Sequence, residues 1–417
     1  MKFVVVQKGA RRAYAIPSIL NDYGMLQRFY TDICGNIGIG RIARYLTWVP
    51  HVGAMAKRLS ARTIPKSVAE ATRVPFVSII LNIACALLMG DSVRNPHLRD
   101  ASEKRRWGAW LKSASIAGAT HVYAMFTECG DYVAYARERG LVVVSEVYIL
   151  LSTDRIIEAE ARQFPEWATA TPAEQTAEYR AAINEHMLRY SDYFICPSKA
   201  VKRDLVANFG VKASRCFVVP YGVSAGWLEL RPEPVRGRVL FVGTADIRKG
   251  IHYLAAAANI LADRARTYEF VVVGSAPAKI MKRPECRNLR FVGHLAIPDL
   301  KEEFRVSDVF VLPSLCEGSA EASYEALAAG LPLVVTEAVG SVARDGVEGR
   351  IIPPRDALSL ANALEEIIEN RNLRNQMGAA ARARARAYLW PRYGRRLVRA
   401  LIRTDASGQR NNMLAQR

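Results

Sequence analysis

The chain has 417 residues, half of them hydrophobic, and carries a formal net charge of +18 at pH 7. This length suits two domains rather than one hydrophobic core, and the apolar content excludes a disordered chain. Seven scattered cysteines include no Cys-x-x-Cys pair. They argue against a zinc site or a disulfide framework and favour reduced thiols in a cytosolic compartment.

The first half of the chain is predicted to be α/β. Residues 2–6 form a first buried strand, too short for the apolar core of a signal peptide. Further strands are predicted near 119–126, 141–146, 193–196 and 216–219, helices at 13–27, 154–190 and 198–209, and a helical, basic stretch at 40–115. The apolar run 74–90 is shorter than the ~20 residues of a spanning helix, so a buried helix and a monotopic membrane contact both stay open.

The second half is more regular. Strands are predicted at 238–243, 269–274, 289–292, 308–313, 332–336 and 350–352, helices at 250–263, 298–305, 319–329 and 357–369, and a helical pattern at 373–403 that breaks at Trp390. Apolar strands that alternate with helices predict a parallel sheet covered on both faces. We therefore predict two Rossmann-like domains facing a cleft, 1–222 and 238–388, joined by a proline-rich linker at 223–237 and followed by a crossover helix and basic tail at 389–417.

Two segments carry much of the positive charge. Residues 371–417 hold twelve arginines and one acid, and the segment 41–73 is basic with Tyr45 and Trp48 among its charges. Such a field suits nucleic acid or an anionic membrane surface, and an ordinary solvated surface is the alternative.

A phosphate site is predicted at the end of the strand 239–243. Gly243 lets the backbone approach a ligand, Thr244 follows it, and Arg248 and Lys249 offer positive charge to a diphosphate. A basic turn without a ligand is the alternative. A second anion site is predicted at the helix that begins near Ser319, the expected N-cap, although Glu321 in the first turn would have to point away.

Glu317 and Glu325 flank the start of this helix. A continuous helix between them would separate the two acids by about 12 Å, the scale of a nucleotide sugar from ribose to hexose. Carboxylates accept hydrogen bonds from vicinal diols, so one acid could hold a ribose and the other a hexose. Two acids on a solvated helix face are the alternative.

Together these motifs resemble a known enzyme family. Gly…Lys-Gly (243–250), Phe-Val-Gly-His (291–294), the run from Ser-Asp-Val-Phe-Val-Leu-Pro-Ser to Glu-Gly (307–318) and Glu-Ala-Leu-Ala-Ala-Gly-Leu-Pro (325–332) are similar to the retaining family-4 (group 1) glycosyltransferases of the GT-B fold. The segments 196–223 and 344–354 fit the same pattern. The resemblance covers about residues 190–390 and is weak over 1–190.

The resemblance implies a role for each matching residue. Glu325 would hold the donor ribose, Glu317 the hexose near the reacting carbon, and Lys249 the diphosphate. Gly9 and Ala10 would face the donor phosphate and the acceptor. The other donor-binding residues would contact the phosphates and the base through their backbone: Gly318, Ser319, Ala320, Glu321, Ala322, Gly293, His294 and Leu295.

The chain departs from the family pattern in three places. Thr244 stands where many members have arginine, so Arg248 would substitute, and Glu-Gly-Ser-Ala replaces the frequent Glu-Gly-Phe-Gly. The histidine with which the first domain often faces the sugar has no clear counterpart. Glu146 is the candidate catalytic residue there, with a structural glutamate as the alternative, and His121 is predicted to be structural.

The expected function is the transfer of a hexose from a UDP- or GDP-sugar to a glycan or lipid-linked acceptor with retention. The chain has no Asp-x-Asp pair, so we expect no metal and no other cofactor. We expect a cytoplasmic enzyme whose segment 41–90 contacts the inner face of the plasma membrane. A nucleotide-sugar epimerase or phosphorylase of the same fold and a non-enzymatic nucleic-acid-binding protein are the alternatives.

Overall fold

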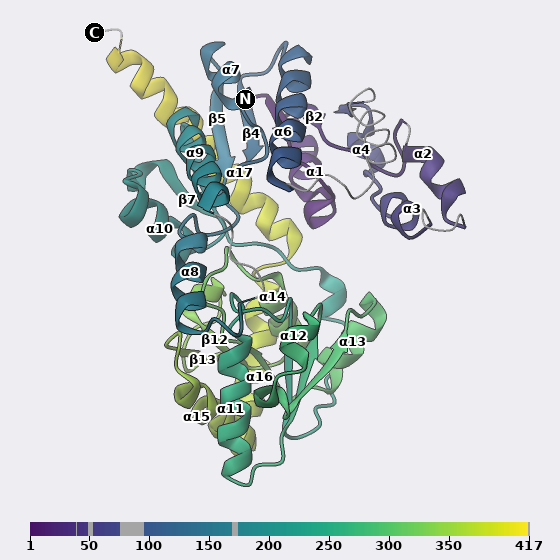
Figure 1. Cartoon of the computed structure of the whole chain (residues 1–417). Coiled ribbons are helices and arrows are strands. Elements are labelled where there is room, and N and C mark those ends of the chain that lie inside the picture. The colour runs from purple at the N-terminus through teal and green to yellow at the C-terminus, as the bar shows by residue number, and fades with distance from the viewer. Residues whose placement is uncertain (39, 49–52, 76–95, 169–173, 416–417) are drawn as a thin grey trace.

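The computed structural model describes residues 1–38, 40–48, 53–75, 96–168 and 174–415, which form two α/β domains (Figure 1). Their strands pair in parallel into two sheets, with the orders β3-β2-β1-β4-β5-β6-β7 and β10-β9-β8-β11-β12-β13. The first sheet contains β1 (Phe3–Val6), β2 (Leu26–Tyr30), β3 (Thr72–Arg73), β4 (His121–Met125), β5 (Val142–Glu146), β6 (Tyr193–Cys196) and β7 (Cys216–Val218). The second contains β8 (Arg238–Val242), β9 (Glu269–Val273), β10 (Leu289–Gly293), β11 (Val309–Leu312), β12 (Leu333–Thr336) and β13 (Gly349–Ile352).

Helices connect the strands and cover the sheets. The N-terminal domain has α1 (Ala15–Asp22), α2 (Gly40–Ala43), α3 (Gly53–Ser60), α4 (Lys66–Ala69), α6 (Pro96–Ser113), α7 (Tyr132–Glu138), α8 (Thr153–Gln163), α9 (Glu174–Tyr190) and α10 (Lys199–Phe209). The C-terminal domain has α11 (Ile251–Asp263), α12 (Ala278–Met281), α13 (Ile297–Val306), α14 (Glu321–Ala329), α15 (Ala357–Glu369) and α16 (Arg371–Arg386), followed by α17 (Trp390–Ala415). The central strands β4, β6, β11 and β12 are buried along their whole length, as expected for parallel sheets covered on both faces. The prediction of two Rossmann-like domains is confirmed.

Two short strands correct the predicted elements of the N-terminal domain. The helix predicted at 13–27 ends at Asp22, because Gly24 adopts a φ of +64° that stops the helix, and the chain continues as β2. Strand β3 interrupts the stretch 40–115, which was predicted to be helical. The apolar run 74–90 lies, from residue 76 on, outside the described residues.

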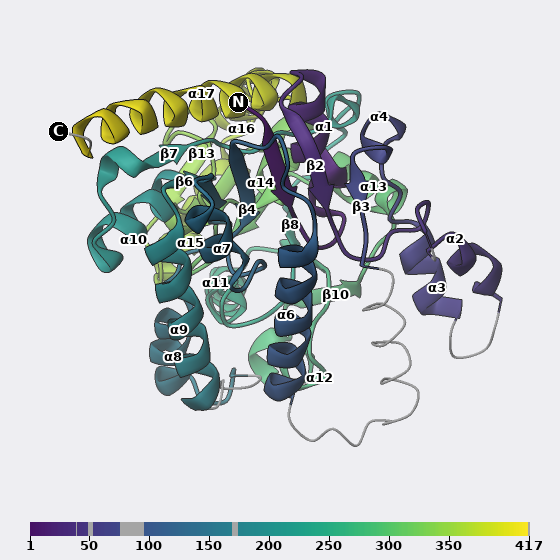
Figure 2. The ribbon, with the colours of Figure 1, turned by 90° about the horizontal axis from the view of Figure 1, so that it is seen from above.

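The last helix returns to the N-terminal domain, as predicted. α17 runs along that domain (Figure 2), where Gly394 packs against Ile19 of α1 and Asp405 lies 3.9 Å from Nε2 of His121. His121 stands at the amino end of β4, and burial lowers its pKa to about 4. Among the described helices, none combines the length and apolarity needed to cross a membrane.

Candidate active site

Lys249 and Glu317 meet at the carboxyl ends of two neighbouring strands, β8 and β11. Nζ of Lys249 lies 2.7 Å and Nη1 of Arg248 lies 2.5 Å from the same oxygen, Oε1 of Glu317. Lys249 is 9% exposed and Glu317 is 8% exposed. Two cations and one carboxylate leave this cluster with a net positive charge in a largely buried setting, which suits an anionic diphosphate.

Two glycines allow this cluster to form. A Cβ on Gly250, whose φ is +70°, would lie 2.1 Å from the carbonyl oxygen of Pro313 at the end of β11. A Cβ on Gly243, whose φ is +149°, would lie 3.3 Å from Cε of Lys249. The loop from β8 to α11 therefore closes on the end of β11, and the Lys249 side chain lies across Gly243.

The helix predicted to begin near Ser319 begins two residues later. α14 starts at Glu321, its N-cap is Ala320, and no side chain caps it. Ser319 is therefore not the N-cap. Its hydroxyl instead donates to the carbonyl oxygen of Gly340 at 2.8 Å, because the buried loop before the helix turns this side chain toward the rest of the domain.

The first turn of α14 has free donors. The N–H groups of Glu321 and Ala322 have no acceptor among the described residues, whereas the N–H of Ala320 donates to the carbonyl oxygen of Val339 at 3.0 Å. The Glu321 side chain is 54% exposed and faces Arg12, whose Nε lies 3.5 Å from its Oε1. Glu321 therefore leaves the helix N-terminus open to an anion, as the prediction required.

Glu325 lies one turn further along α14 and is mostly buried. Its carboxylate has no hydrogen-bond or ion-pair partner in the part of the chain that the structure describes. Burial, with Glu321 as a smaller cause, raises the pKa of Glu325 to about 7. The continuous helix assumed between the two acids is wrong, because residues 317–320 precede α14, so a separation deduced from helical rise does not apply.

The residues predicted to meet the nucleotide lie at the same edge of the sheet. Thr244, Gly293 and His294 are exposed, and Leu295 is half-buried beside them. Gly293 ends β10 with a φ of +76°, and a side chain there would meet no atom within 4 Å. This edge is open to a ligand, and the contacts assigned to these residues remain predictions.

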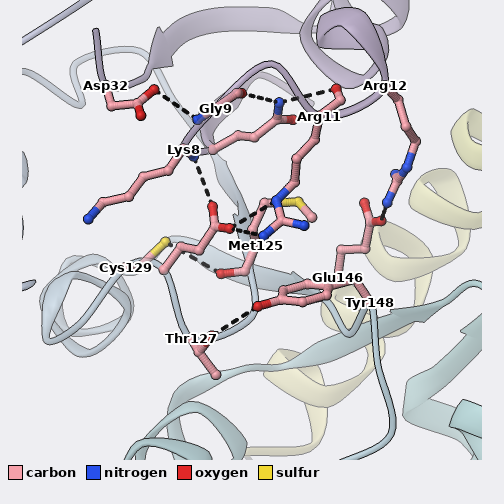
Figure 3. A network of polar contacts seen from close by, with 12 residues as sticks. Lys8, Gly9, Arg11, Arg12, Asp32, Met125, Thr127, Cys129, Glu146 and Tyr148 are labelled. Carbon is pink, nitrogen blue, oxygen red and sulfur yellow. Dashed lines mark hydrogen bonds and ion pairs between the residues drawn. The ribbon is translucent and has the colours of Figure 1, made fainter. Parts of the chain in front are cut away.

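In the N-terminal domain, acids that lie just after the neighbouring strands β2 and β4 hold the loop that follows β1 (Figure 3). The N–H of Gly9 donates to Oδ1 of Asp32 at 2.8 Å, and the N–H of Lys8 donates to Oε2 of Glu128 at 2.8 Å. Nη2 of Arg11 donates to Oε1 of Glu128 at 2.6 Å. The loop that begins with Gly9 and Ala10 is thus fixed at the carboxyl end of β1.

Arg12 is a residue of this loop to which the sequence assigned no role. Its Nη2 lies 2.5 Å from Oε1 of Glu146, and its guanidinium lies 3.7 Å from the centre of the Tyr221 ring. The hydroxyls of Tyr123 and Tyr221 donate to Oε2 and Oε1 of Glu146 at 2.5 Å and 3.3 Å. Burial alone would lower the pKa of Arg12, but Glu146 raises it well above its usual value. Glu146, predicted as a catalytic contact, is fully buried and anchors Arg12.

The same loop has a strained backbone. Arg12, Ala13 and Tyr14 adopt φ values of 48°, 49° and 61°, a left-handed turn of three consecutive non-glycine residues. Each such residue costs roughly 1–2 kcal/mol, so the surroundings must hold the turn in place. Arg12 does so through Glu146, and Tyr14 through its fully buried ring. Strain of this kind is concentrated at functional sites.

Gly318 packs tightly against the N-terminal domain. A Cβ at this position would lie 1.7 Å from the carbonyl oxygen of Tyr148, in the loop after β5. The hydroxyl of Ser198 donates to the carbonyl oxygen of Gly318 at 2.6 Å. Only glycine fits here, and its position places the neighbouring Glu317 at the junction of the domains.

A cavity of about 300 Å³ lies in the N-terminal domain beside this contact. Its wall includes Tyr148 and is formed by the residues after β4 and β5 and by parts of α8 and α9. The lining is mainly apolar, with an ion pair between Asp154 and Arg180 and with Asn184 among its polar groups. The carboxyl ends of parallel strands are the usual place for a ligand in such a sheet.

Two segments of the chain match known families. Residues 236–370 match the family described as glycosyl transferases group 1, and residues 158–226 match glycosyltransferase family 4. Among curated relatives, the glycogen synthase of Mycobacterium tuberculosis is 26% identical over 257 residues, which cover 59% of each chain. The D-inositol 3-phosphate glycosyltransferase of Geodermatophilus obscurus is 30% identical over 249 residues, which cover 53% of this chain and 54% of that protein. The matches thus span less than two thirds of these relatives.

Solved structures share the fold over nearly the whole chain. Sucrose-phosphate synthase from Thermosynechococcus elongatus has a TM-score of 0.64 at 18% identity and covers 98% of this chain and 100% of that one. HepE of Anabaena, in complex with UDP and glucose, has a TM-score of 0.61 at 15% identity, covering 96% and 99%. At these identities the likeness shows the fold alone. The chain is therefore a protein of the GT-B fold with group 1 and family 4 glycosyltransferase domains.

Proposed function

We propose that this chain transfers a hexose from a nucleotide-diphosphate sugar to a glycan or lipid-linked acceptor, with retention at the anomeric carbon and without a metal. The observation that carries the proposal is the largely buried cluster of Arg248, Lys249 and Glu317, which is net positive and whose Glu317 lies four residues before the open N-terminus of α14. The group 1 domain match over 236–370 contains this whole cluster.

Glycosyl transfer develops positive charge on the sugar while a diphosphate leaves with growing negative charge. Lys249, Arg248 and the free N–H groups of Glu321 and Ala322 supply fixed positive charge and donors for that leaving group. Glu317 contacts both cations and adjoins Gly318 at the domain junction. In this proposal it accepts hydrogen bonds from hexose hydroxyls and positions the sugar instead of attacking it.

The remaining residues of the site suit the nucleotide part of the donor. Glu325, a mostly buried acid without a partner in the described structure, accepts hydrogen bonds from the ribose hydroxyls, and the backbone at 293–295 meets the base. Because HepE of Anabaena was solved with UDP and glucose, we propose a UDP-sugar as the first donor to test and a GDP-sugar as the second.

The cavity beside Tyr148 is the proposed acceptor site. It adjoins the contact with Gly318, so a bound hydroxyl group would lie on the side from which Glu317 presents the sugar. The mainly apolar wall with Asp154, Arg180 and Asn184 suits an acceptor that has both apolar and hydroxyl-rich parts.

A thermal-shift series with UDP-, GDP- and ADP-sugars tests the donor, since a ligand that binds only the folded state raises its stability. Binding of one nucleotide class is expected, and loss of that shift in Glu325→Ala supports the ribose contact. A protein that binds none of these donors would contradict the proposal. Transfer assays with and without EDTA test the metal, and the anomeric configuration of the product tests retention.

Incubation of the donor alone separates the alternatives of the same fold. An epimerase would convert the donor sugar with no acceptor present, and a phosphorylase would need inorganic phosphate instead of a nucleotide. Both family matches are to glycosyltransferases, so nucleic-acid binding is not proposed.

A further inference from the structure

Four large apolar side chains are exposed within a segment of seven residues. Ile42 is 52% exposed, Tyr45 61%, Leu46 39% and Trp48 80%. No other large hydrophobic side chain of the described residues is as exposed as Trp48. Single exposed apolar residues are ordinary on a protein surface, but a cluster of this kind indicates a contact surface.

Cations surround this cluster, and acids are absent from it. The sequence from 33 to 69 contains six lysines and arginines and no aspartate or glutamate. Arg41, Arg44, Lys57 and Arg58 are exposed on α2, η2 (Arg44–Leu46) and α3. Nη2 of Arg44 donates to the hydroxyl of Tyr45 at 2.6 Å and holds that ring among the charges. Exposed apolar and aromatic side chains ringed by cations are typical of surfaces that bind the membrane interface.

Hydrogen bonds link the two ends of the segment that carries this surface. Nδ2 of Asn36 donates to the carbonyl oxygen of Ile64 at 2.7 Å, and the N–H of Ile64 donates to Oδ1 of Asn36 at 2.8 Å. The N–H of Gly35 donates to the carbonyl oxygen of Arg62 at 2.8 Å. Figures 1 and 2 both show α2 and α3 projecting from the side of the N-terminal domain, well apart from α17. Hydrogen bonds thus join the two ends of the segment that carries the exposed side chains, and this segment lies away from α17.

We propose that residues 40–48 and 53–60, which we call the docking lobe, bind the surface of a bilayer that contains anionic phospholipids. A bilayer accommodates both features of the lobe, since Ile42, Leu46 and Trp48 enter the interface while the cations pair with lipid phosphates. Nucleic acid would pair with the cations but leave the aliphatic side chains in water.

Docking would also orient the protein. Nη1 of Arg62, just beyond the lobe, lies 3.5 Å from Oδ2 of Asp32, and Oδ1 of Asp32 accepts from the N–H of Gly9. The lobe is therefore tied to the loop at the carboxyl end of β1. If the proposed function holds, the contact brings a lipid-linked acceptor to that end of the domain.

Flotation of the full chain with vesicles tests the docking. The protein is expected to float with vesicles of phosphatidylcholine and phosphatidylglycerol and much less with phosphatidylcholine alone. Three of the six tryptophans are buried, and Trp48 is the most exposed. Vesicles are therefore expected to shift the tryptophan fluorescence emission to shorter wavelength in the wild type and not in Trp48→Phe. No nucleotide sugar is present, so failure of the proposed transferase activity leaves this result unchanged.

Two variants with the same loss of charge locate the contact. Arg44→Gln, Lys57→Gln and Arg58→Gln together are expected to weaken binding by about fivefold per cation removed. Arg392→Gln, Arg395→Gln and Arg399→Gln, all exposed on α17, are expected to leave it unchanged. Thermal melts show whether each variant is folded. Equal losses in both variants, an unshifted tryptophan emission on binding, or absence of flotation would each overturn the proposal.

Discussion

Nζ of Lys249 lies 2.7 Å from Oε1 of Glu317, so the carboxylate proposed to position the sugar is held by the lysine proposed to neutralise the diphosphate. Arg248 binds the same oxygen. The two roles are therefore coupled, because removal of either partner changes the charge that the other experiences.

Lys249→Met is expected to reduce kcat/KM for transfer by about 10²–10³-fold, the range for loss of one preorganised group that stabilises a developing anion. Glu317→Gln keeps both cations and is expected to lower turnover while donor affinity is retained. Steady-state kinetics and nucleotide titration separate these effects. Lys282→Met, an exposed lysine of the same domain, is the control and should behave as wild type. Wild-type turnover in both Lys249→Met and Glu317→Gln would contradict the assignment.

Glu325 should make the stability of the folded protein depend on pH. Its pKa is raised to about 7 in the folded protein, mainly by burial, above about 4.3 in the unfolded chain. Between these values the folded state binds more protons, so this residue lowers stability as pH rises through that window. Glu325→Gln is expected to be more stable than wild type at pH 8 and to lose this advantage at pH 4, about the limits of the window, as chemical denaturation would measure.

Glu321→Gln provides the control, because Glu321 is the charged neighbour that contributes to the raised pKa of Glu325. This variant should lower the pKa of Glu325 in the folded protein part of the way toward its usual value, so stability should fall over a narrower range of pH. A stability difference between Glu325→Gln and wild type that does not change with pH would show that Glu325 ionises normally.

The glycines of the site could be predicted from the sequence, and the ion pairs could not. Gly243 and Gly250 stand at strand ends beside charged residues, so the need for close backbone approach follows from the sequence. Whether Lys249 faces a ligand or Glu317 depends on how the loop after β11 folds, and no local pattern encodes that. The prediction of Ser319 as N-cap is wrong for the same reason. The fold of this loop turns the Ser319 hydroxyl toward the distant carbonyl oxygen of Gly340 instead of the helix N-terminus.

Arg12 shows a second limit. The basic pair after Gly9 and Ala10 is visible in the sequence, but its partner Glu146 lies at the end of β5, two strands away in the sheet. From the sequence alone, each of the two residues would be interpreted as an ordinary charged side chain on the protein surface. The fold brings them together in a buried setting, and only there does the pair acquire a structural role.

Gly318→Ala tests the contact between the domains. The new Cβ would lie 1.7 Å from the Tyr148 carbonyl oxygen, so either the loop or the domain must move. We expect a loss of about 1–3 kcal/mol of stability and a marked loss of turnover. Gly108→Ala on α6, whose Cβ would meet nothing nearer than 3.9 Å, should be neutral or stabilise by about 0.5–1 kcal/mol. Thermal denaturation and transfer assays on both variants decide this, and an unchanged Gly318→Ala protein would exclude a close domain contact in solution.

Arg12→Ala should destabilise the protein far more than the neighbouring Arg11→Ala. Without Arg12 the fully buried carboxylate of Glu146 loses its cation and, among the described residues, keeps two tyrosine hydroxyls as partners. Breaking such a buried pair costs about 3–5 kcal/mol. Arg11 pairs with Glu128 through a side chain that is 37% exposed, and a pair of that kind contributes about 1 kcal/mol or less. Denaturant unfolding of the two variants measures the difference. The double variant Arg12→Met with Glu146→Gln should recover much of the loss, because it removes both buried charges together; if it unfolds as readily as Arg12→Ala, the cost comes from the strained turn of residues 12–14 and not from the unpaired acid.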